Sequence, residues 1–120
     1  MKICDVIGWA DEIKPNAFSD EVKMGWLNSL EGRVMAGVFL LSAAGISEYG
    51  YAHPRDMDTE LMVKPPHDDI YGLWLAAKID EANGEYDKFA NSSQIFNAHY
   101  ASFTRWFADT YNPALGHAAR

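Results

Sequence analysis

The sequence predicts an all-α fold, a four-helix bundle-like domain that occupies residues 1–120 as a single unit. Three observations predict this fold. The length of 120 residues and the hydrophobic content of 48% suit one domain with one core. Four segments show the spacing of apolar residues that is typical of one helical face. Glycines and prolines separate these four segments, as helix breakers do.

The first helix is predicted over residues 3–13, where the apolar residues fall three and four positions apart. Lys14-Pro15 ends it, because the residue before a proline disfavours the helical conformation. Ser19 then has the position of an N-cap, with Asp20 and Glu21 in a first turn where the helix dipole favours negative charge. The second helix is predicted to run from Asp20 to about Ala44, with Gly45 as its stop.

The second helix carries a strip of small residues, which are Gly25, Ser29, Gly32 and Ala36. A glycine inside a helix costs about 1 kcal/mol relative to alanine, so the strip predicts close approach by another helix. The aromatic face of the last helix is the expected neighbour. Arg33 lies among the apolar positions of this helix and needs a carboxylate partner, for which Asp80 is the hypothesis.

Helical spacing stops over residues 45–64, and we expect an extended loop or a small hairpin there. A connection of this length in a small domain is often functional, so it is predicted as an arm for contacts with partners. Tyrosine, tryptophan and methionine are common at interfaces. The side chains that we assign to such contacts are Tyr49, Tyr51, Met57, Met62 and Trp106.

The third helix is predicted to start at His67-Asp68-Asp69 and to end at Asn83-Gly84. Its residues 70–79 are apolar almost all round, which places it in the centre of the bundle. A long fourth helix follows over Glu85 to Tyr111, about 40 Å in length at 1.5 Å per residue. Ile95, His99 and Trp106 share a second face of that helix. Its main stripe consists of Tyr86, Phe89, Ser93, Phe96, Tyr100, Phe103 and Phe107.

Composition and charge exclude several classes of function. The net charge of −7 lacks the basic patches that nucleic-acid binding requires, so we expect no sequence-specific nucleic-acid partner. The longest apolar run, Val38 to Leu41, is too short to cross a bilayer, and no membrane partner is expected. Cys4 is the only cysteine, which rules out a disulfide framework within one chain.

No residue pattern predicts catalysis, and we expect no enzyme activity, no catalytic residue, no cofactor and no bound metal. His67-Asp68-Asp69 resembles a metal-binding pair, but the dipole of the helix start explains these residues without a metal. Ser92-Ser93 lies inside a helix and lacks the strained turn that exposes a serine nucleophile. Asp5 beside Cys4 is expected to raise the pKa of the thiol, which works against reactivity.

Three runs of sequence resemble small proteins encoded in the structural gene blocks of tailed bacteriophages and prophages. The first extends from Lys14-Pro15-Asn16-Ala17-Phe18-Ser19-Asp20-Glu21 to Trp26-Leu27-Asn28-Ser29-Leu30-Glu31-Gly32-Arg33. The second joins Asp58-Thr59-Glu60-Leu61 to Pro65-Pro66-His67-Asp68-Asp69-Ile70-Tyr71, and the third runs from Ala82-Asn83-Gly84-Glu85-Tyr86 to Tyr100. Together they cover most of the chain, and the layout resembles that of head–tail connector (head-completion) proteins.

The resemblance implies a virion structural adaptor, a subunit that assembles with copies of itself as a ring between portal and tail. It implies the portal and tail-side proteins as further partners, and a location in the virion and, during assembly, in the host bacterial cytoplasm. No catalytic residues follow from it. Another class of function remains open, a small acidic phage-encoded protein that binds and regulates a host protein. A metal-dependent hydrolase built on His67 is a third alternative.

Overall fold

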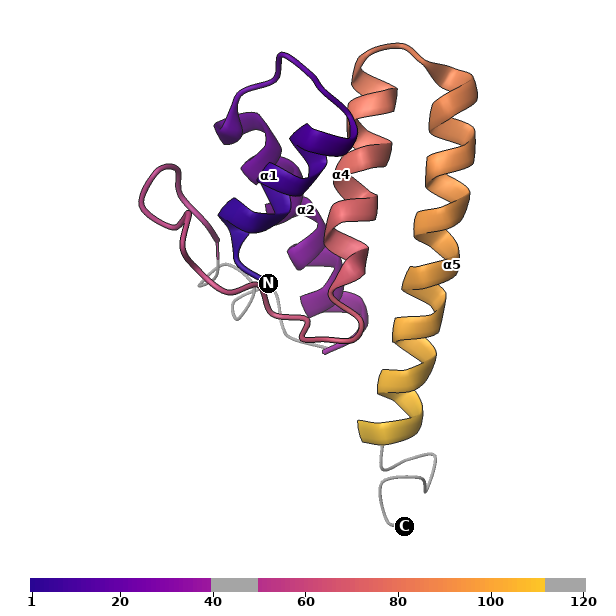
Figure 1. Cartoon of the computed structure of the whole chain (residues 1–120). Coiled ribbons are helices and arrows are strands. Elements are labelled where there is room, and N and C mark those ends of the chain that lie inside the picture. Colours follow the sequence, from indigo (N-terminus) through magenta and orange to yellow (C-terminus); the bar gives the residue numbers. More distant parts are fainter. Residues whose placement is uncertain (40–49, 112–120) are drawn as a thin grey trace.

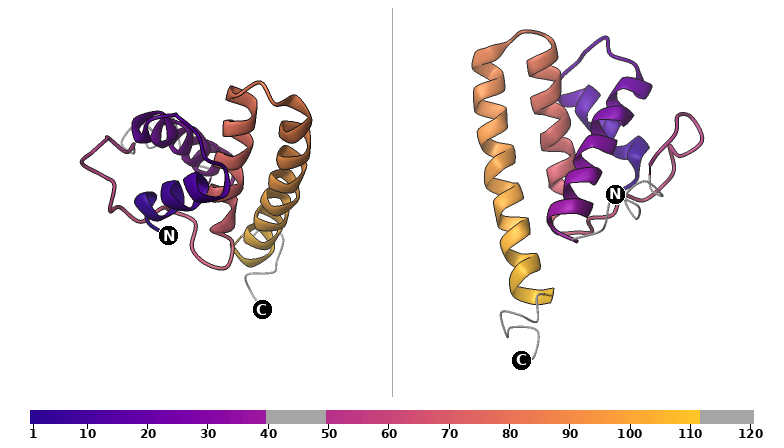
Figure 2. Two further views of the ribbon diagram at one scale, coloured as in Figure 1. Left: turned by 45° about the horizontal axis from the view of Figure 1, so that its top comes forward. Right: turned by 180° about the vertical axis from the view of Figure 1, so that it is seen from behind.

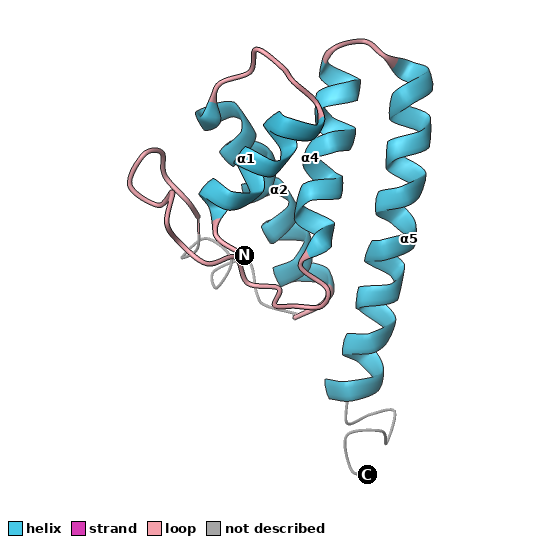
Figure 3. Ribbon diagram, viewed as in Figure 1, coloured by secondary structure: helices cyan, strands magenta, loops and turns pink. Residues whose placement is uncertain are grey.

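The computed structural model describes residues 1–39 and 50–111. Its helices are α1 (Ile3–Ile13), α2 (Asp20–Gly37), α4 (Asp69–Ala82) and α5 (Tyr86–Tyr111), which confirms the all-α prediction (Figure 1). Figure 3 shows no strand in the described part of the chain. The only strand-like pairing recorded for these residues is an isolated antiparallel bridge between Lys2 and Glu60. The hairpin alternative is therefore wrong for residues 50–64, which form a loop with turns at residues 53–58.

Helix α1 forms where it was predicted. Its four buried residues recur at spacings of three, one and three, so they lie on a single face of the helix. The helix ends at Ile13, and the backbone N–H of Lys14 still donates to the carbonyl of Ala10 at 2.8 Å. Pro15 follows and prevents continuation. The buried residues of α1 are Ile3, Val6, Ile7 and Ala10.

Helix α2 begins as expected but ends earlier. The Ser19 hydroxyl accepts a hydrogen bond from the backbone N–H of Val22 at 3.2 Å, which confirms the N-cap. The helix ends at Gly37 and not near Ala44, and the predicted stop at Gly45 lies outside the described residues. After Gly37 the chain turns, and the Phe39 ring packs against Phe107 of α5 with 5.1 Å between ring centroids.

Helix α4 is the centre of the domain. It packs against α1, α2 and α5, and Figure 2 shows it between α5 and the pair formed by α1 and α2. Nine of its fourteen residues are buried, as an all-round apolar helix requires. Asn83 and Gly84 close it as predicted, and Gly84 adopts a positive φ of 72° that glycine accommodates without strain.

Helix α5 runs antiparallel to α4 and packs mainly on it, and its last turns extend past the rest of the body (Figure 1). Phe96 and Phe103 in its stripe are buried, whereas Tyr86 at the start of the stripe is 71% exposed. The stripe therefore faces α4. The predicted contact with the small-residue strip of α2 is wrong, because a Cβ added at Gly25 or Gly32 would meet no atom within 4 Å.

Candidate interaction surface

A buried carboxylate holds the segment after residue 50 against the helices. Glu31 of α2 is 2% exposed, and its side chain accepts hydrogen bonds from the hydroxyls of Tyr51 at 2.6 Å and Tyr71 at 2.5 Å. It also accepts from the backbone N–H of Met62 at 3.0 Å. The Tyr71 hydroxyl in turn accepts from the backbone N–H of Val63 at 2.8 Å. Three separate parts of the chain thus meet at one carboxylate, with every donor satisfied.

The Glu31 carboxylate also changes the acidity of both tyrosines. Burial and the neighbouring negative charge of Glu31 raise the pKa of Tyr71 far above its usual value of 10.0. Burial, followed by the hydrogen bond to Glu31, raises the pKa of Tyr51 in the same way. Both hydroxyls therefore stay protonated at neutral pH and act as donors to the carboxylate.

The arm predicted at residues 45–64 is tied to the helices at both ends of its described part. The Asn28 side chain accepts from the N–H of Tyr51 at 2.8 Å and donates to its carbonyl at 2.9 Å. Leu61 and Val63 are buried, and Met57 packs against the core. Tyr51 and residues 61–63 are therefore anchored to the folded body, whereas residues 52–55 are exposed on a projecting loop (Figure 1). Tyr49, the other tyrosine predicted for contacts, lies outside the described residues.

Two further buried ionic groups fix the helices relative to one another. Asp80 of α4 is 3% exposed, and it pairs with the Lys14 ammonium at 2.8 Å and accepts from the Ser92 hydroxyl of α5 at 2.9 Å. The hypothesis that Asp80 pairs with Arg33 is wrong. Lys23 of α2 is 2% exposed and pairs with Asp11 of α1 at 2.5 Å. Because these pairs cross between helices, they keep the outer surfaces in a fixed arrangement.

The acids at the start of α4 diverge. Asp68 pairs with the N-terminal ammonium at 3.6 Å, and Asp69 contacts Nδ1 of His99 on α5 at 2.8 Å. His67 instead stacks on Trp106, with 4.7 Å between ring centroids. Among residues 1–39 and 50–111, no group of three or more His, Cys, Asp or Glu side chains is arranged to hold a metal ion.

The side chains considered as nucleophiles have structural partners. Ser92 donates to Asp80, and the Ser93 hydroxyl donates to the carbonyl of Ala90 at 3.1 Å, as serines inside helices often do. Partial burial, the hydrogen bond to Asp58 and the charge of Asp5 all raise the pKa of the Cys4 thiol. A raised pKa lowers the fraction of reactive thiolate at neutral pH.

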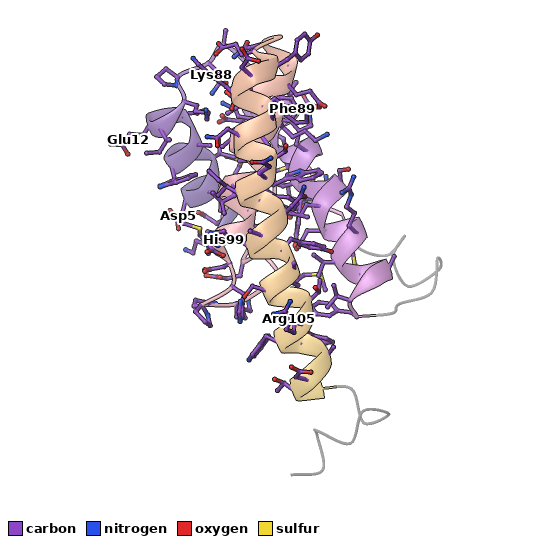
Figure 4. All side chains as sticks on the ribbon, turned by 90° about the vertical axis from the view of Figure 1, so that its right-hand side faces the viewer. Asp5, Glu12, Lys88, Phe89, His99 and Arg105 are labelled. Carbon is purple, nitrogen blue, oxygen red and sulfur yellow. The ribbon has the colours of Figure 1, made fainter. Side chains whose placement is uncertain are left out.

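Two grooves flank α5, one on each side. The α1–α5 groove has a volume of about 300 Å³, and apolar atoms make up most of its lining. At its floor the Trp9 ring lies directly over Gly72 of α4, where an added Cβ would come within 2.6 Å of the ring carbon Cζ3. Figure 4 shows His99 on the side of α5 that faces α1. The groove is lined by Met1, Val6, Trp9, Asp68, Asp69, Gly72, Leu73 and His99.

The α2–α5 groove lies on the other side of α5, where Figure 4 shows Phe89. It has a volume of about 340 Å³, and its wall combines aromatic and charged groups. Two cations lie over one ring, because the Arg33 guanidinium carbon and the Lys78 ammonium are each 4.8 Å from the Trp74 ring centroid. The groove is lined by Arg33, Trp74, Ala77, Lys78, Glu81, Phe89, Ser93, Phe96 and Asn97.

The side of α1 that faces away from the core mixes apolar and acidic residues. Trp9 is 38% exposed and Ile13 is 57% exposed, and both lie on the same helix face as Asp5 and Glu12. Figure 4 shows Asp5 and Glu12 pointing away from α5 and α2. We call these four residues the α1 outer face. Large exposed apolar side chains beside charged ones are typical of protein interaction sites.

Neither the α1 outer face nor the α2–α5 groove was predicted from the sequence. Ile13 was predicted as a core residue, and Trp9 was given no role. Arg33 was predicted to pair with a buried acid. The alternation of Asp5, Trp9 and Glu12 along one side of α1 was the available signal. Trp106 was assigned to contacts, and its side chain is 40% exposed.

Comparisons with protein-family models, curated proteins and solved structures gave no match to this chain. Within the described residues, no helix combines the length and apolar character needed to cross a membrane. The function is therefore argued from the surface of the molecule and from the resemblance of its sequence.

Proposed function

We propose that this chain is a structural adaptor of a tailed-phage particle, a head–tail connector subunit that assembles with copies of itself between portal and tail. The observation that carries the proposal is the apolar α1–α5 groove, which Trp9 lines and near which Ile13 of the same helix is exposed, on a domain of net charge −7. Such a patch on an acidic surface suits contact with another protein. The resemblance of three sequence runs to phage structural proteins supports other phage structural proteins as the partners.

The internal construction of the domain suits this role. Glu31, Asp80 and Lys23 are buried ionic groups whose partners lie on other helices or on the segment after residue 50. Buried polar networks with every member satisfied favour one well-defined arrangement. A rigid body lowers the entropy that is lost when copies associate, because fewer side chains and loops become ordered at the interface.

Deletion of the gene from its phage tests the proposal. Without an adaptor, heads fill with DNA but do not join tails, so electron micrographs of the lysate should show separate heads and tails. Expression of the protein from a plasmid should restore complete particles. If complete tailed particles form in the absence of the gene, the chain is not a head–tail adaptor. That result, together with altered growth of the host, would favour a regulator of a host protein instead.

A further inference from the structure

The α2–α5 groove contains a cation, Arg33, that has no acidic partner within the described part of the chain. Arg33 is exposed, and none of the ion pairs or hydrogen bonds of residues 1–39 and 50–111 involves its guanidinium. Arg33 lies over the Trp74 ring, and that ring is held in place because its indole Nε1 donates to the carbonyl of Trp26 at 2.7 Å. A guanidinium stacked in this way keeps its N–H donors in a planar fork that matches a carboxylate.

Lys78 adds a second positive charge next to Arg33. Its ammonium lies over the same ring and 3.6 Å from Glu81, which is the only acid among the described residues that line the groove. Two cations and one acid leave the groove positive, in a chain whose net charge is −7. The aromatic wall beside them, which includes Phe89, provides apolar contact area. A ligand that fits this groove therefore presents a carboxylate next to apolar side chains.

The α1 outer face has this chemistry. Helix α1 contains three acids and no lysine or arginine. Asp11 is already paired with Lys23, whereas Asp5 and Glu12 are exposed. Trp9 and Ile13 supply exposed apolar surface on the same side of the helix. The two surfaces are thus complementary in charge, and both combine charged with apolar groups.

The two surfaces lie on different sides of the molecule, since α1 and α2 flank α5 on opposite sides (Figure 4). We propose that the α1 outer face of one copy seats against the α2–α5 groove of the next copy, with Glu12 as the carboxylate that Arg33 binds. Two different surfaces that bind each other form a head-to-tail interface, and each copy then offers a free surface to a further copy. Such an interface closes into a ring when its rotation allows closure. The inference rests on the proposed function and specifies the contact between copies.

Reciprocal charge reversal tests this contact. Arg33→Glu places Glu12 against a glutamate, and Glu12→Arg places Arg33 against an arginine. Each variant alone should need about a tenfold or higher concentration than the wild type to assemble, as measured by sedimentation velocity at low salt. An equimolar mixture of the two variants should recover assembly, because each interface of an alternating ring then pairs opposite charges. Both positions are exposed, so circular dichroism should show an unchanged helix content.

The controls separate this contact from general effects of charge. Arg105→Glu and Glu21→Arg make the same changes in net charge at exposed positions outside both surfaces, and they should leave assembly unchanged. Wild-type chains that stay monomeric, single variants that assemble normally, or a mixture that does not recover would each overturn the inference. The proposed function is judged separately by the particles that the deletion phage produces, so the two can fail independently.

Discussion

Replacement of Tyr71 by phenylalanine should destabilise the fold strongly, although it removes one oxygen atom. The Tyr71 hydroxyl donates to Glu31 and accepts from the N–H of Val63, and both Tyr71 and Val63 are buried. A hydrogen bond to a charged group contributes about 1.5–3 kcal/mol, and a buried N–H left without an acceptor costs about 1–3 kcal/mol. The two effects overlap, and we expect a loss of roughly 3–5 kcal/mol in the free energy of unfolding.

Urea denaturation followed by helical circular dichroism measures this loss. Tyr86→Phe is the matched control, because Tyr86 is 71% exposed and its change should stay within about 0.5 kcal/mol. A double-mutant cycle with Glu31→Gln then isolates the coupling between the two side chains. If Tyr71→Phe lowers the free energy of unfolding by less than about 1 kcal/mol, the Tyr71 hydroxyl does not help to hold Glu31 and Val63 in place.

Three further predictions concern stability. Gly72→Ala should lower the free energy of unfolding by roughly 1–3 kcal/mol, because the added methyl group displaces the Trp9 ring, and tryptophan fluorescence should change. The control Gly32→Ala should instead raise the free energy of unfolding by up to about 1 kcal/mol. Equal effects of the two substitutions would contradict the close contact between Gly72 and Trp9. Because the pKa of Tyr71 is raised on folding, its contribution to the free energy of unfolding is complete below pH 10. Above pH 10 the tyrosine ionises in the unfolded state, and the free energy of unfolding falls by about 1.4 kcal/mol per pH unit. Absorbance at 295 nm should show that this tyrosine titrates only when the protein unfolds. Asp80→Asn should lower the free energy of unfolding, measured by heat or urea, by about 1.5–3 kcal/mol. An unchanged free energy would show that the bonds of Asp80 to Ser92 and Lys14 do not stabilise the fold.

The sequence predicted the features that depend on neighbouring residues. The cap at Ser19, the stop before Pro15 and the turn at Asn83-Gly84 each follow from local backbone chemistry, and the structure contains all three. The central place of α4 also followed, because a helix that is apolar on every side has to be buried. These signals need no knowledge of distant residues.

The errors concern groups whose partners are distant in the sequence. Glu31 and Lys23 are polar residues on the buried side of α2, and only their contacts with Tyr71 and Asp11 make that burial possible. Without knowledge of those contacts, another helix was predicted to pack on the strip with Gly25, and that prediction is wrong. Arg33 was assigned to a buried acid because stacking on an aromatic ring leaves no sequence pattern.

The contact surface was difficult to predict for the same reason. Apolar spacing along α1 places Ile13 with the core residues, yet the helix ends there and its side chain is 57% exposed. The two grooves combine residues from three helices each, so they exist only once the helices are packed. The sequence did contain one signal for the contact surface, the acidic and apolar residues on one exposed side of α1.

Cysteine cross-linking tests the claim that copies join through two different surfaces. In a Cys4→Ser background, Gly8→Cys places a thiol on the exposed side of α1, where an added Cβ meets nothing within 4 Å, and Asn97→Cys places one on the wall of the α2–α5 groove. With a short bifunctional maleimide, the double variant should give a ladder of covalent multimers beyond the dimer on denaturing gels, while each single-cysteine variant should give no ladder. Products that stop at the dimer, or chains that stay uncross-linked, would contradict head-to-tail assembly.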